Sequence, residues 1–358
     1  MSNGLAGVVA AETVLSDVDG MAGRLVIRGL PLEALQGQRF EAVLHLLWQG
    51  FFDDLPNPDA LASALGAARA RSFSRLADTR GLPPFDAVRA LMARQSDGND
   101  LATALDLVAG TAVFLPAVLR GRSNLAAIAP DPSLPHAVDS LRMLSGDAPT
   151  AARAAALDAY LVTVADHGLN ASTFAARVVA STQAGLLSST LAALGALKGP
   201  LHGGAPGPVL DMLDAIGSPD HAGPWIEAAL TRGERLMGFG HRIYRVRDPR
   251  ADALQRALDL LRSSGNADVA RTSLATQVES AALAALHRHK PERPLATNVE
   301  FYTALLLEAL GFPREAFTAV FAMGRVGGWI AHAREEGLNG KLIRPLSRYV
   351  GPMPREAA

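Results

Sequence analysis

The chain has 358 residues and a mass of 37.5 kDa, and 49% of its residues are hydrophobic while 19% are charged. This balance excludes a disordered chain, and the length suits one large domain or two of ordinary size. The 34 basic and 35 acidic residues give a formal net charge of -1, so no overall positive field attracts nucleic acid or an anionic membrane. We therefore expect no nucleic-acid partner.

The chain contains no cysteine. That composition excludes disulfides and thiolate metal sites and is consistent with a reducing compartment, so we expect a cytoplasmic protein. The N-terminal segment carries Glu12, Asp17 and Asp19 where a secretory signal would need apolar residues. The longest apolar stretch, residues 107–119, is interrupted by Pro116 and is shorter than the roughly 20 residues that cross a membrane. We expect no membrane partner.

Alanine and leucine recur at helical spacing along most of the chain, as in EAVLHLLWQG (residues 41–50) and ADALQRALDLLRSSG (residues 251–265). This pattern predicts an all-α protein. The one convincing strand candidate is GRLVIRG, residues 23–29, which follows the turn-forming sequence SDVDG and predicts a small N-terminal β-hairpin. Neither a repeat nor a low-complexity linker divides the chain, which predicts a single compact helical body.

Two segments combine glycine with histidine, KGPLHGGAPGPVL (residues 198–210) and MGFGHRIYRVRDPR (residues 237–250). Glycines beside a helix start leave backbone N–H groups free to bind an anion. His202 precedes a helical segment, whose dipole is expected to keep the imidazole neutral and able to donate to a carbonyl oxygen. A capping histidine among structural glycines is the alternative.

Several arginines follow His241 closely, and guanidinium groups commonly bind carboxylates and phosphates. They predict a polyanionic ligand, unless the segment is simply a solvated basic turn. The sequence GFGH lacks the third glycine and the preceding strand of a nucleotide-binding fingerprint. The arginines are Arg242, Arg245, Arg247 and Arg250.

Four further residues are candidates for a site. His167 lies at an interruption between two helical segments, where a buried structural histidine is equally plausible. Glu300 stands before a mostly apolar helix, where desolvation would raise the pKa of its carboxyl towards the general-base range; otherwise it is a favourable first-turn charge. Arg325 and Arg344 have apolar neighbours and need anionic partners. The other histidines lack metal-ligand spacing, so we expect no metal.

Seven segments, in order, resemble the citrate synthase family, and they extend over nearly the whole chain. The resemblance implies an all-α, multi-helical fold and an obligate homodimer. A large domain (residues 1–203 and 311–358) would carry the dimer interface, and a small mobile domain (residues 204–310) would bind CoA across the active-site cleft. The segments are VVAAETVLSDVDGMAGRLVIRG, DHGLNASTFAARV, GPLHGGAPGPVL, MGFGHRIYRVRDPRA, NVEFY, GRVGGWIAHAREE and IRPLSRYVGP.

The resemblance also implies roles for individual residues. His202 would hydrogen-bond the thioester carbonyl of acetyl-CoA, His241 would polarise the ketone of oxaloacetate, and Glu300 would remove the methyl proton. The carboxylates of oxaloacetate would be held by His167, Arg250, Arg325 and, from the partner subunit, Arg344. CoA would be bound by Arg245, Met237, Gly238 and Gly240. No organic cofactor or metal is implied.

The sequence departs from the family at the base, because the usual Asp of NVDFY is Glu300 here. One extra methylene moves the carboxylate by roughly 1 Å, and a misplacement of that size can cost about 10²-fold in rate.

From the resemblance as a whole we expect a citrate synthase, an acyltransferase that condenses acetyl-CoA with oxaloacetate. The alternatives are a 2-methylcitrate synthase that uses propionyl-CoA and, from another class, a catalytically weak CoA-binding or regulatory paralogue. A smaller departure is Leu346, where relatives often carry arginine.

Overall fold

The computed structural model describes residue 5 and residues 7–203, 206–292 and 295–353. In this part of the chain, fifteen α-helices surround a continuous apolar core, and the β-structure is limited to three short strands and one isolated bridge between Phe239 and Thr297. The prediction of an all-α protein is confirmed.

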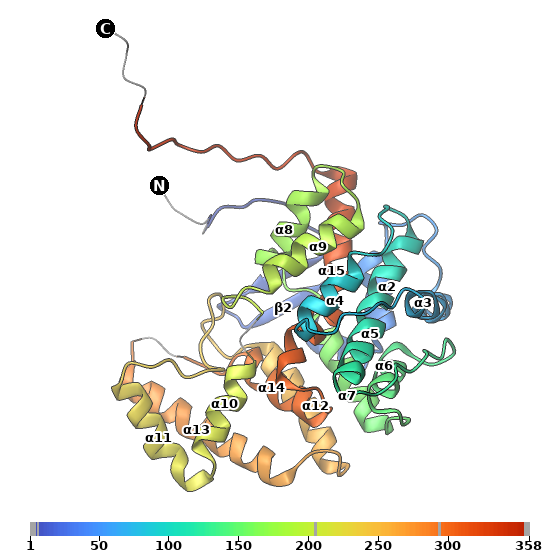
Figure 1. Cartoon of the computed structure of the whole chain (residues 1–358). Helices are drawn as coiled ribbons and strands as arrows, with labels where there is room; N and C mark the ends of the chain where they lie inside the picture. The colour runs from blue at the N-terminus through green and yellow to red at the C-terminus, as the bar shows by residue number, and fades with distance from the viewer. Residues whose placement is uncertain (1–4, 6, 204–205, 293–294, 354–358) are drawn as a thin grey trace.

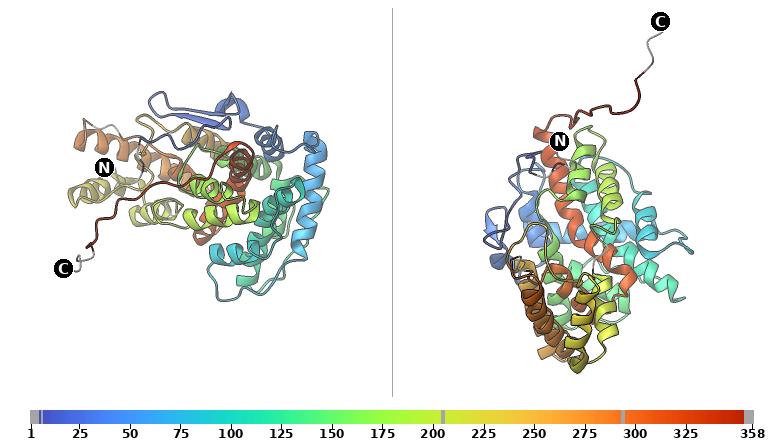
Figure 2. Two further views of the ribbon diagram at one scale, coloured as in Figure 1. Left: turned by 90° about the horizontal axis from the view of Figure 1, so that it is seen from above. Right: turned by 90° about the vertical axis from the view of Figure 1, so that its left-hand side faces the viewer.

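The small sheet has the strand order β1 (Ser16–Asp19), β2 (Arg24–Ile27) and β3 (Leu30–Pro31), all antiparallel. The predicted hairpin is confirmed, but the sequence SDVDG was wrongly assigned to a turn. Its first four residues form β1, and the turn comes afterwards, where the Asp19 carboxylate accepts hydrogen bonds from the N–H groups of Met21 and Ala22. The sheet lies at the edge of the molecule in both views of Figure 2.

Most helices belong to the main body, in which α5 and α15 are central (Figure 1). Helix α5 packs against α3, α4, α6 and α15, and α15 also packs against α7, α8 and α9. These helices are α1 (Leu32–Leu35), α2 (Phe40–Trp48), α3 (Pro58–Phe73), α4 (Pro84–Met92), α5 (Leu101–Arg122), α6 (His136–Ser145), α7 (Ala151–Val164), α8 (Ala171–Ala180), α9 (Leu186–Leu197) and α15 (Phe317–Asn339).

Helix α5 continues through Pro116, so the prediction that this proline interrupts the apolar stretch was wrong. Proline removes one backbone hydrogen bond from a helix, and close packing on several sides compensates here. By length and composition α5 would be able to cross a membrane, but 78% of its apolar window is buried inside the fold. A helix that is apolar all round is typical of a protein core as well.

A second group of helices lies beside the main body. Helices α10, α11 and α13 form a lobe at the lower left of Figure 1, and α12 packs against both α14 and α7. All five fall within residues 204–310, the predicted small domain, whose first two residues lie outside the described part. The helices are α10 (Gly207–Ile216), α11 (Pro219–Thr231), α12 (Pro249–Ser263), α13 (Val269–His289) and α14 (Val299–Ala309), followed by the 3-10 helix η1 (Arg314–Ala316).

Two glycines allow α15 to approach the end of α7 closely. A Cβ atom on Gly324 would overlap the side chain of Val164, and one on Gly328 would overlap the carbonyl oxygen of Ala165. Any larger residue would therefore push the helices apart. This close approach brings Arg325 and the rest of that face of α15 next to the loop that follows α7.

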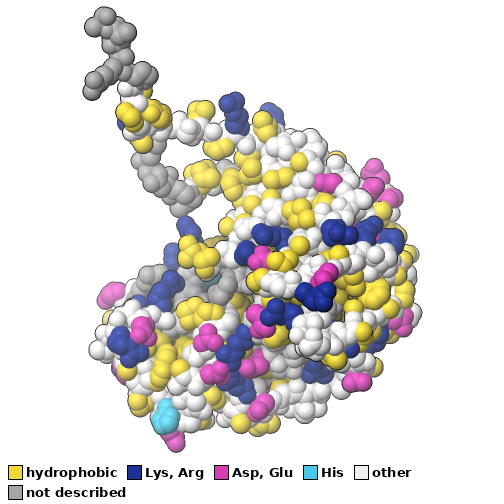
Figure 3. All heavy atoms as spheres, viewed as in Figure 1, with side chains coloured by type: hydrophobic (Ala, Val, Ile, Leu, Met, Phe, Trp, Pro, Cys, Tyr) yellow, Lys and Arg dark blue, Asp and Glu magenta, His cyan; other side chains and the backbone are white. Residues whose placement is uncertain are grey.

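After α15 the chain leaves the body as an extended tail, residues 340–353, visible in Figures 1 and 2. The backbone N–H of Ile343 donates to Ser181 Oγ, but most of the following side chains are exposed, including Leu346 at 100% and Val350 at 86%. On the body, positive and negative side chains are interspersed over the visible face (Figure 3), as the balanced composition predicts.

Candidate active site

His241 has one ring nitrogen fixed by the backbone and the other directed at an arginine. Its Nδ1 accepts hydrogen bonds from the N–H groups of Ile243 (3.0 Å) and Tyr244 (3.1 Å), so the proton of the neutral ring resides on Nε2. Burial and the nearby Arg250 lower the pKa of His241 to about 4. Nε2 lies 3.3 Å from Nη2 of Arg250, whose N–H is directed at it. With the proton on Nε2 both groups are donors, so an oxygen atom bound near them would accept hydrogen bonds from both.

Arg250 is held rigidly at the start of α12. Its guanidinium makes a two-point ion pair with the buried carboxylate of Asp248, at 3.1 Å from Nε and 2.8 Å from Nη2. The same carboxylate accepts from the N–H of Val299, the first residue of α14. Asp248 therefore fixes the position of Arg250 relative to α14, the helix that carries Glu300. The sequence did not predict this role of Asp248.

His167 lies in the loop between α7 and α8, and its ring is 5.9 Å from that of His241. Tyr244 lies beside both rings and places its hydroxyl 3.0 Å from His167 Nε2. Burial, with Arg250 and Arg325 nearby, holds the pKa of His167 well below its usual range, so the ring is neutral. Tyr244 was missed, although it follows His241 by three residues in the same motif.

Arg325 is a buried cation in α15 with no ion-pair partner in the described part of the chain. Its side chain is 1% exposed, Nε donates to the carbonyl of Val164, and Nη2 has no hydrogen-bond partner among the described residues. Burial lowers its pKa to about 10, and Arg250 contributes. Because an unpaired guanidinium is costly to bury, the site is suited to an anion.

Glu300 lies in the first turn of α14, which Asn298 caps by accepting from the Glu300 N–H. The side chain is partly buried, and burial raises the pKa of its carboxyl to about 7, although Arg250 opposes the rise. Among the described residues no side chain pairs with this carboxylate. A carboxyl with a pKa near neutrality can take up a proton and give it back, as general-base catalysis requires.

His202 lies in the turn after α9, where its Nε2 is 2.8 Å from Ser172 Oγ in the first turn of α8. Burial and Arg325 lower the pKa of His202 to about 4, so the ring is neutral. The cause is mainly burial rather than the helix dipole expected from the sequence. Helix α10 begins only at Gly207, and residues 204 and 205 lie outside the described part.

The loop that contains Gly238 and Gly240 forms hydrogen bonds with the segment that precedes α14, next to His241. Gly240 N–H donates to the carbonyl of Ala296, the Asn298 N–H donates to the carbonyl of Gly238, and the Asn298 side chain donates to the carbonyl of Gly240. Both glycines have a positive φ, and a Cβ on Gly238 would overlap Phe301. Met237 is partly buried and packs against the core.

A cavity of about 400 Å³ opens beside these loops. Its lining includes Gly240, His241, Arg245 and Leu295. A larger cavity of about 570 Å³ lies between residues 76–82, which precede α4, and the end of α5, and none of the predicted site residues lines it. We place the candidate site beside the smaller cavity, because His241 and Tyr244, whose pKa values are shifted by burial, line it.

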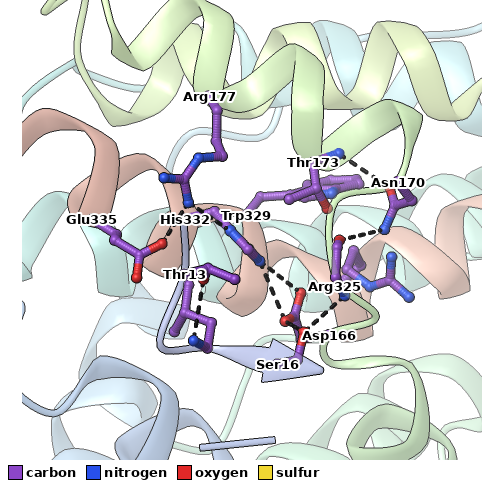
Figure 4. Close-up of polar contacts among 12 residues, drawn as sticks. Thr13, Ser16, Asp166, Asn170, Thr173, Arg177, Arg325, Trp329, His332 and Glu335 are labelled. Atoms are coloured by element: carbon purple, nitrogen blue, oxygen red, sulfur yellow. Dashed lines mark hydrogen bonds and ion pairs between the residues drawn. The ribbon is translucent and has the colours of Figure 1, made fainter. Parts of the chain in front are cut away.

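A buried polar network fixes Asp166, the residue that precedes His167 (Figure 4). Arg177 donates to Nδ1 of His332 at 3.0 Å, and Nε2 of His332 lies 3.2 Å from the carboxylate of Asp166. Asp166 also accepts from Ser16 Oγ of β1, while Arg177 forms an ion pair with Glu335. The network thus ties the N-terminal sheet, α8 and α15 to the residue that precedes His167.

Three sequence interpretations change in the structure. Arg344 is exposed on the extended tail rather than buried among apolar neighbours, and this tail leads away from the helical body (Figure 1). Arg247 is not available to bind a ligand, because its guanidinium already donates hydrogen bonds to Asp252, Glu279 and Gln255. His332 had no recognisable partners in the sequence, yet it is central to the buried network. By contrast, the predicted residues of four segments, His167, His241, Arg250, Glu300 and Arg325, lie around one site.

Comparison with known proteins gives consistent matches over the full chain. The family model of the citrate synthase C-terminal domain matches residues 4–346. Citrate synthase of Haloferax volcanii is 38% identical over 371 residues, covering 98% of this chain and 96% of the relative. 2-Methylcitrate synthase of Mycobacterium tuberculosis is 38% identical over 367 residues, covering 98% of this chain and 91% of the relative.

Solved structures match equally well. Citrate synthase from Thermotoga maritima superposes with a TM-score of 0.84 at 33% identity, covering 100% of this chain and 98% of the other. The ternary complex of carboxymethyl coenzyme A and oxaloacetate with citrate synthase from Thermoplasma acidophilum gives a TM-score of 0.85 at 28% identity, with the same coverage. The fold is therefore shared along the whole chain.

Proposed function

The chain belongs to the citrate synthase family of acyltransferases, and from that membership we propose that it condenses acetyl-CoA with oxaloacetate and hydrolyses the resulting citryl-CoA to citrate and CoA. The observation that carries the proposal is the 3.3 Å approach of the Arg250 guanidinium to His241 Nε2, together with a carboxyl of Glu300 whose pKa is raised to about 7 and is influenced by Arg250.

The first step removes a proton from the methyl group of acetyl-CoA. The Glu300 carboxylate takes this proton, and the electron pair moves onto the thioester oxygen. His202 donates a hydrogen bond to that oxygen, which stabilises the enolate charge as it develops. A neutral imidazole suits this role, and the lowered pKa of His202, about 4, keeps it neutral at physiological pH.

In the second step the enolate carbon attacks the ketone carbon of oxaloacetate. The ketone oxygen gains negative charge, which the His241 Nε2–H and Arg250 stabilise. The two carboxylates of oxaloacetate need cationic partners, and Arg325 offers an unpaired Nη2 atom. His167 adds a neutral donor. Water then hydrolyses the citryl thioester, releasing CoA and citrate.

We propose that CoA binds at the 400 Å³ cavity, along the backbone of residues 237–240 and near Arg245. We also propose that residues 204–310 move as a small domain that closes this cleft on the substrates and excludes water. The contact between α12 and α7 would then be the surface on which the domain turns, because it joins the two groups of helices.

A homodimer is the proposed assembly, with each tail packed on the partner subunit. Most apolar side chains of residues 340–353 are exposed with respect to the described part of their own chain, and an extended exposed apolar segment is typical of a protein interface. In such a dimer the partner subunit's Arg344 would reach the oxaloacetate site. No metal or organic cofactor takes part in the proposed reaction.

A second candidate is 2-methylcitrate synthase, because the mycobacterial relative of that name is as similar to this chain, at 38% identity, as the citrate synthase of Haloferax volcanii. The test is CoA release by the purified protein with oxaloacetate, measured as kcat/KM for acetyl-CoA and propionyl-CoA. A preference for acetyl-CoA supports citrate synthesis, and a preference for propionyl-CoA supports the alternative. If no CoA is released from either thioester, the proposal is overturned and a weak CoA-binding paralogue is favoured.

A further inference from the structure

Tyr244 contacts two of the neutral histidines of the candidate site. Its ring centroid lies 4.8 Å from that of His241 and 5.6 Å from that of His167, and the tyrosine side chain is buried. Tyr244 also lines the cavity of about 400 Å³, together with His241. No step of the proposed reaction uses Tyr244, although it touches two of the side chains that bind the substrate.

The contact of Tyr244 with His241 is made by the backbone. The Tyr244 N–H donates to Nδ1 of His241 at 3.1 Å, and the N–H of Ile243 donates to the same nitrogen at 3.0 Å. Because Nδ1 accepts from both, the proton of the neutral His241 ring resides on Nε2. This arrangement depends on the course of the chain and not on the side chain at position 244.

The contact of Tyr244 with His167 is made by the side chain. The hydroxyl oxygen lies 3.0 Å from Nε2 of His167, and it forms no other hydrogen bond with the described residues. A phenol O–H is a stronger acid than a neutral imidazole N–H, and the imidazole lone pair is the better acceptor, so the hydroxyl donates to Nε2. In the opposite direction the buried phenol proton would lack an acceptor in the described part of the chain, which is costly.

The direction of this hydrogen bond matters because both rings are neutral. Burial, with Arg250 nearby, lowers the pKa values of His167 and His241. A neutral imidazole has one donor nitrogen and one acceptor nitrogen, so its tautomer decides which nitrogen can donate to a substrate oxygen. The Arg250 guanidinium carbon lies 5.8 Å from the centre of the Tyr244 ring, and this cation–π contact helps to hold the phenol.

The N-terminal sheet holds the backbone on both sides of the hydrogen bond. The Arg245 N–H donates to the carbonyl of Gly20, in the turn after β1, at 2.8 Å. The Gly168 N–H donates to Ser16 Oγ of β1, also at 2.8 Å. The segments that carry Tyr244 and His167 are thus attached to the same hairpin, which fixes the tyrosine hydroxyl relative to the imidazole.

We propose that Tyr244 is a positioning residue that gives the two histidines opposite tautomers, with the proton on Nε2 of His241 and on Nδ1 of His167. This inference deepens the proposed function, because it rests on oxaloacetate binding at these histidines. The Nε2–H of His241 then donates to the ketone oxygen, and the Nδ1–H of His167 donates to a carboxylate. In the other tautomer, His167 Nδ1 would present a lone pair to the carboxylate, which repels it.

The test is Tyr244→Phe, studied by nitrogen NMR of resting protein labelled at histidine, in which the shifts of the two ring nitrogens report the site of the proton. Signals are assigned with His167→Gln and His241→Gln. We expect the proton on Nδ1 of His167 in the wild type and a shift towards Nε2 in Tyr244→Phe. The His241 signals should stay in place, because the backbone donors remain. A wild-type His167 protonated on Nε2, or unchanged His167 signals in the variant, would overturn the proposal.

The matched control is Tyr302→Phe. It also removes the hydroxyl of a buried tyrosine, but this hydroxyl donates to Glu279 and not to a histidine. We expect both His167 and His241 to keep their tautomers in this variant. An equal change at His167 in both variants would show that losing any buried phenol disturbs the ring, and it would contradict a specific role for Tyr244.

Oxaloacetate binding, measured by calorimetric titration without an acyl-CoA, gives a second test that does not depend on turnover. Tyr244→Phe is expected to bind oxaloacetate about 3- to 10-fold more weakly than the wild type, because the preferred donor of His167 is lost. Tyr302→Phe should bind it as the wild type does. Equal affinities for Tyr244→Phe and the wild type would overturn the role in binding. A wild type that binds no oxaloacetate would overturn the proposed function, and the tautomers would still decide whether Tyr244 sets them.

Discussion

Ser172 Oγ lies 2.8 Å from Nε2 of His202, so the direction of this hydrogen bond fixes which ring nitrogen of the histidine carries the proton. The Ser172 oxygen also accepts a hydrogen bond from the indole N–H of Trp329 and lies 2.8 Å from Oδ1 of Asn170. A hydroxyl has a single proton to donate. Ser172 Oγ donates that proton to Oδ1 of Asn170 or to Nε2 of His202, which both lie at 2.8 Å. In the second case the imidazole proton resides on Nδ1, which then becomes the donor to a thioester oxygen.

Ser172→Ala is therefore expected to lower kcat by about 10-fold, since the imidazole loses the contact that sets its tautomer, while the KM for oxaloacetate stays nearly constant. The variant also leaves the Trp329 N–H unpaired, so we expect a lower Tm. Steady-state kinetics and a thermal melt measure both effects. Ser172→Thr, which keeps the hydroxyl, is the control, and equal kcat values for alanine and threonine would exclude the role.

Arg325→Met is expected to reduce the affinity for oxaloacetate by about 10- to 100-fold, because a hydrogen-bonded charge pair with a substrate carboxylate is lost. The Tm should equal or exceed that of the wild type, since an unpaired guanidinium leaves the core. Calorimetric titration and thermal melts measure the two quantities. Unchanged oxaloacetate affinity would mean that the unpaired Nη2 atom has another purpose.

Buried histidines predict a loss of stability in acid. Burial lowers the pKa values of His202 and His241 to about 4, and those of His136 and His167 fall below the usual 6.5 as well. Between pH 6.5 and 4 the unfolded chain binds more protons than the folded one, so stability falls as the pH falls through this window. The raised pKa of Glu300 acts in the opposite direction.

Thermal melts between pH 7.5 and 4.5 measure this dependence. His202→Gln is expected to show a shallower fall of Tm on acidification than the wild type, because one histidine that must stay neutral has been removed. Identical slopes for the two proteins would show that His202 titrates in the folded state as freely as in the unfolded chain.

Arg344 allows a direct test of a shared site. We expect Arg344→Gln and His241→Gln to be nearly inactive as separate proteins. If Arg344 acts in the partner's site, a mixed dimer has one site that lacks both residues and one that is complete. Activity should therefore return when the two variants are unfolded together and refolded. A mixture as inactive as its components would place both residues in the same subunit's site.

Local motifs predicted much of this site because their residues are close in sequence. His241 and Arg250 are nine positions apart, and the intervening backbone itself orients the His241 ring. The helical fold was predictable for a similar reason, since apolar spacing repeats within each helix. Glu300 was recognisable because its polar cap and apolar helix are adjacent.

The residues that were missed depend on contacts between distant segments. Ser16 and Asp166 are 150 positions apart, and no pattern in either segment indicates their hydrogen bond. Tyr160 lies inside an apolar helix, where the sequence predicts an ordinary core residue. Its hydroxyl is completely buried and has no hydrogen-bond partner among the described residues, which becomes visible only in the folded structure.

CoA release from acetyl-CoA in the presence of oxaloacetate, compared between the wild type and Glu300→Gln, tests the central claim most directly. The account predicts steady turnover by the wild type and a loss of at least about 100-fold in the variant. The variant should remain folded, with a Tm at pH 8 no lower than that of the wild type, and it should still bind oxaloacetate. Equal turnover by both proteins would contradict the claim that Glu300 is the base.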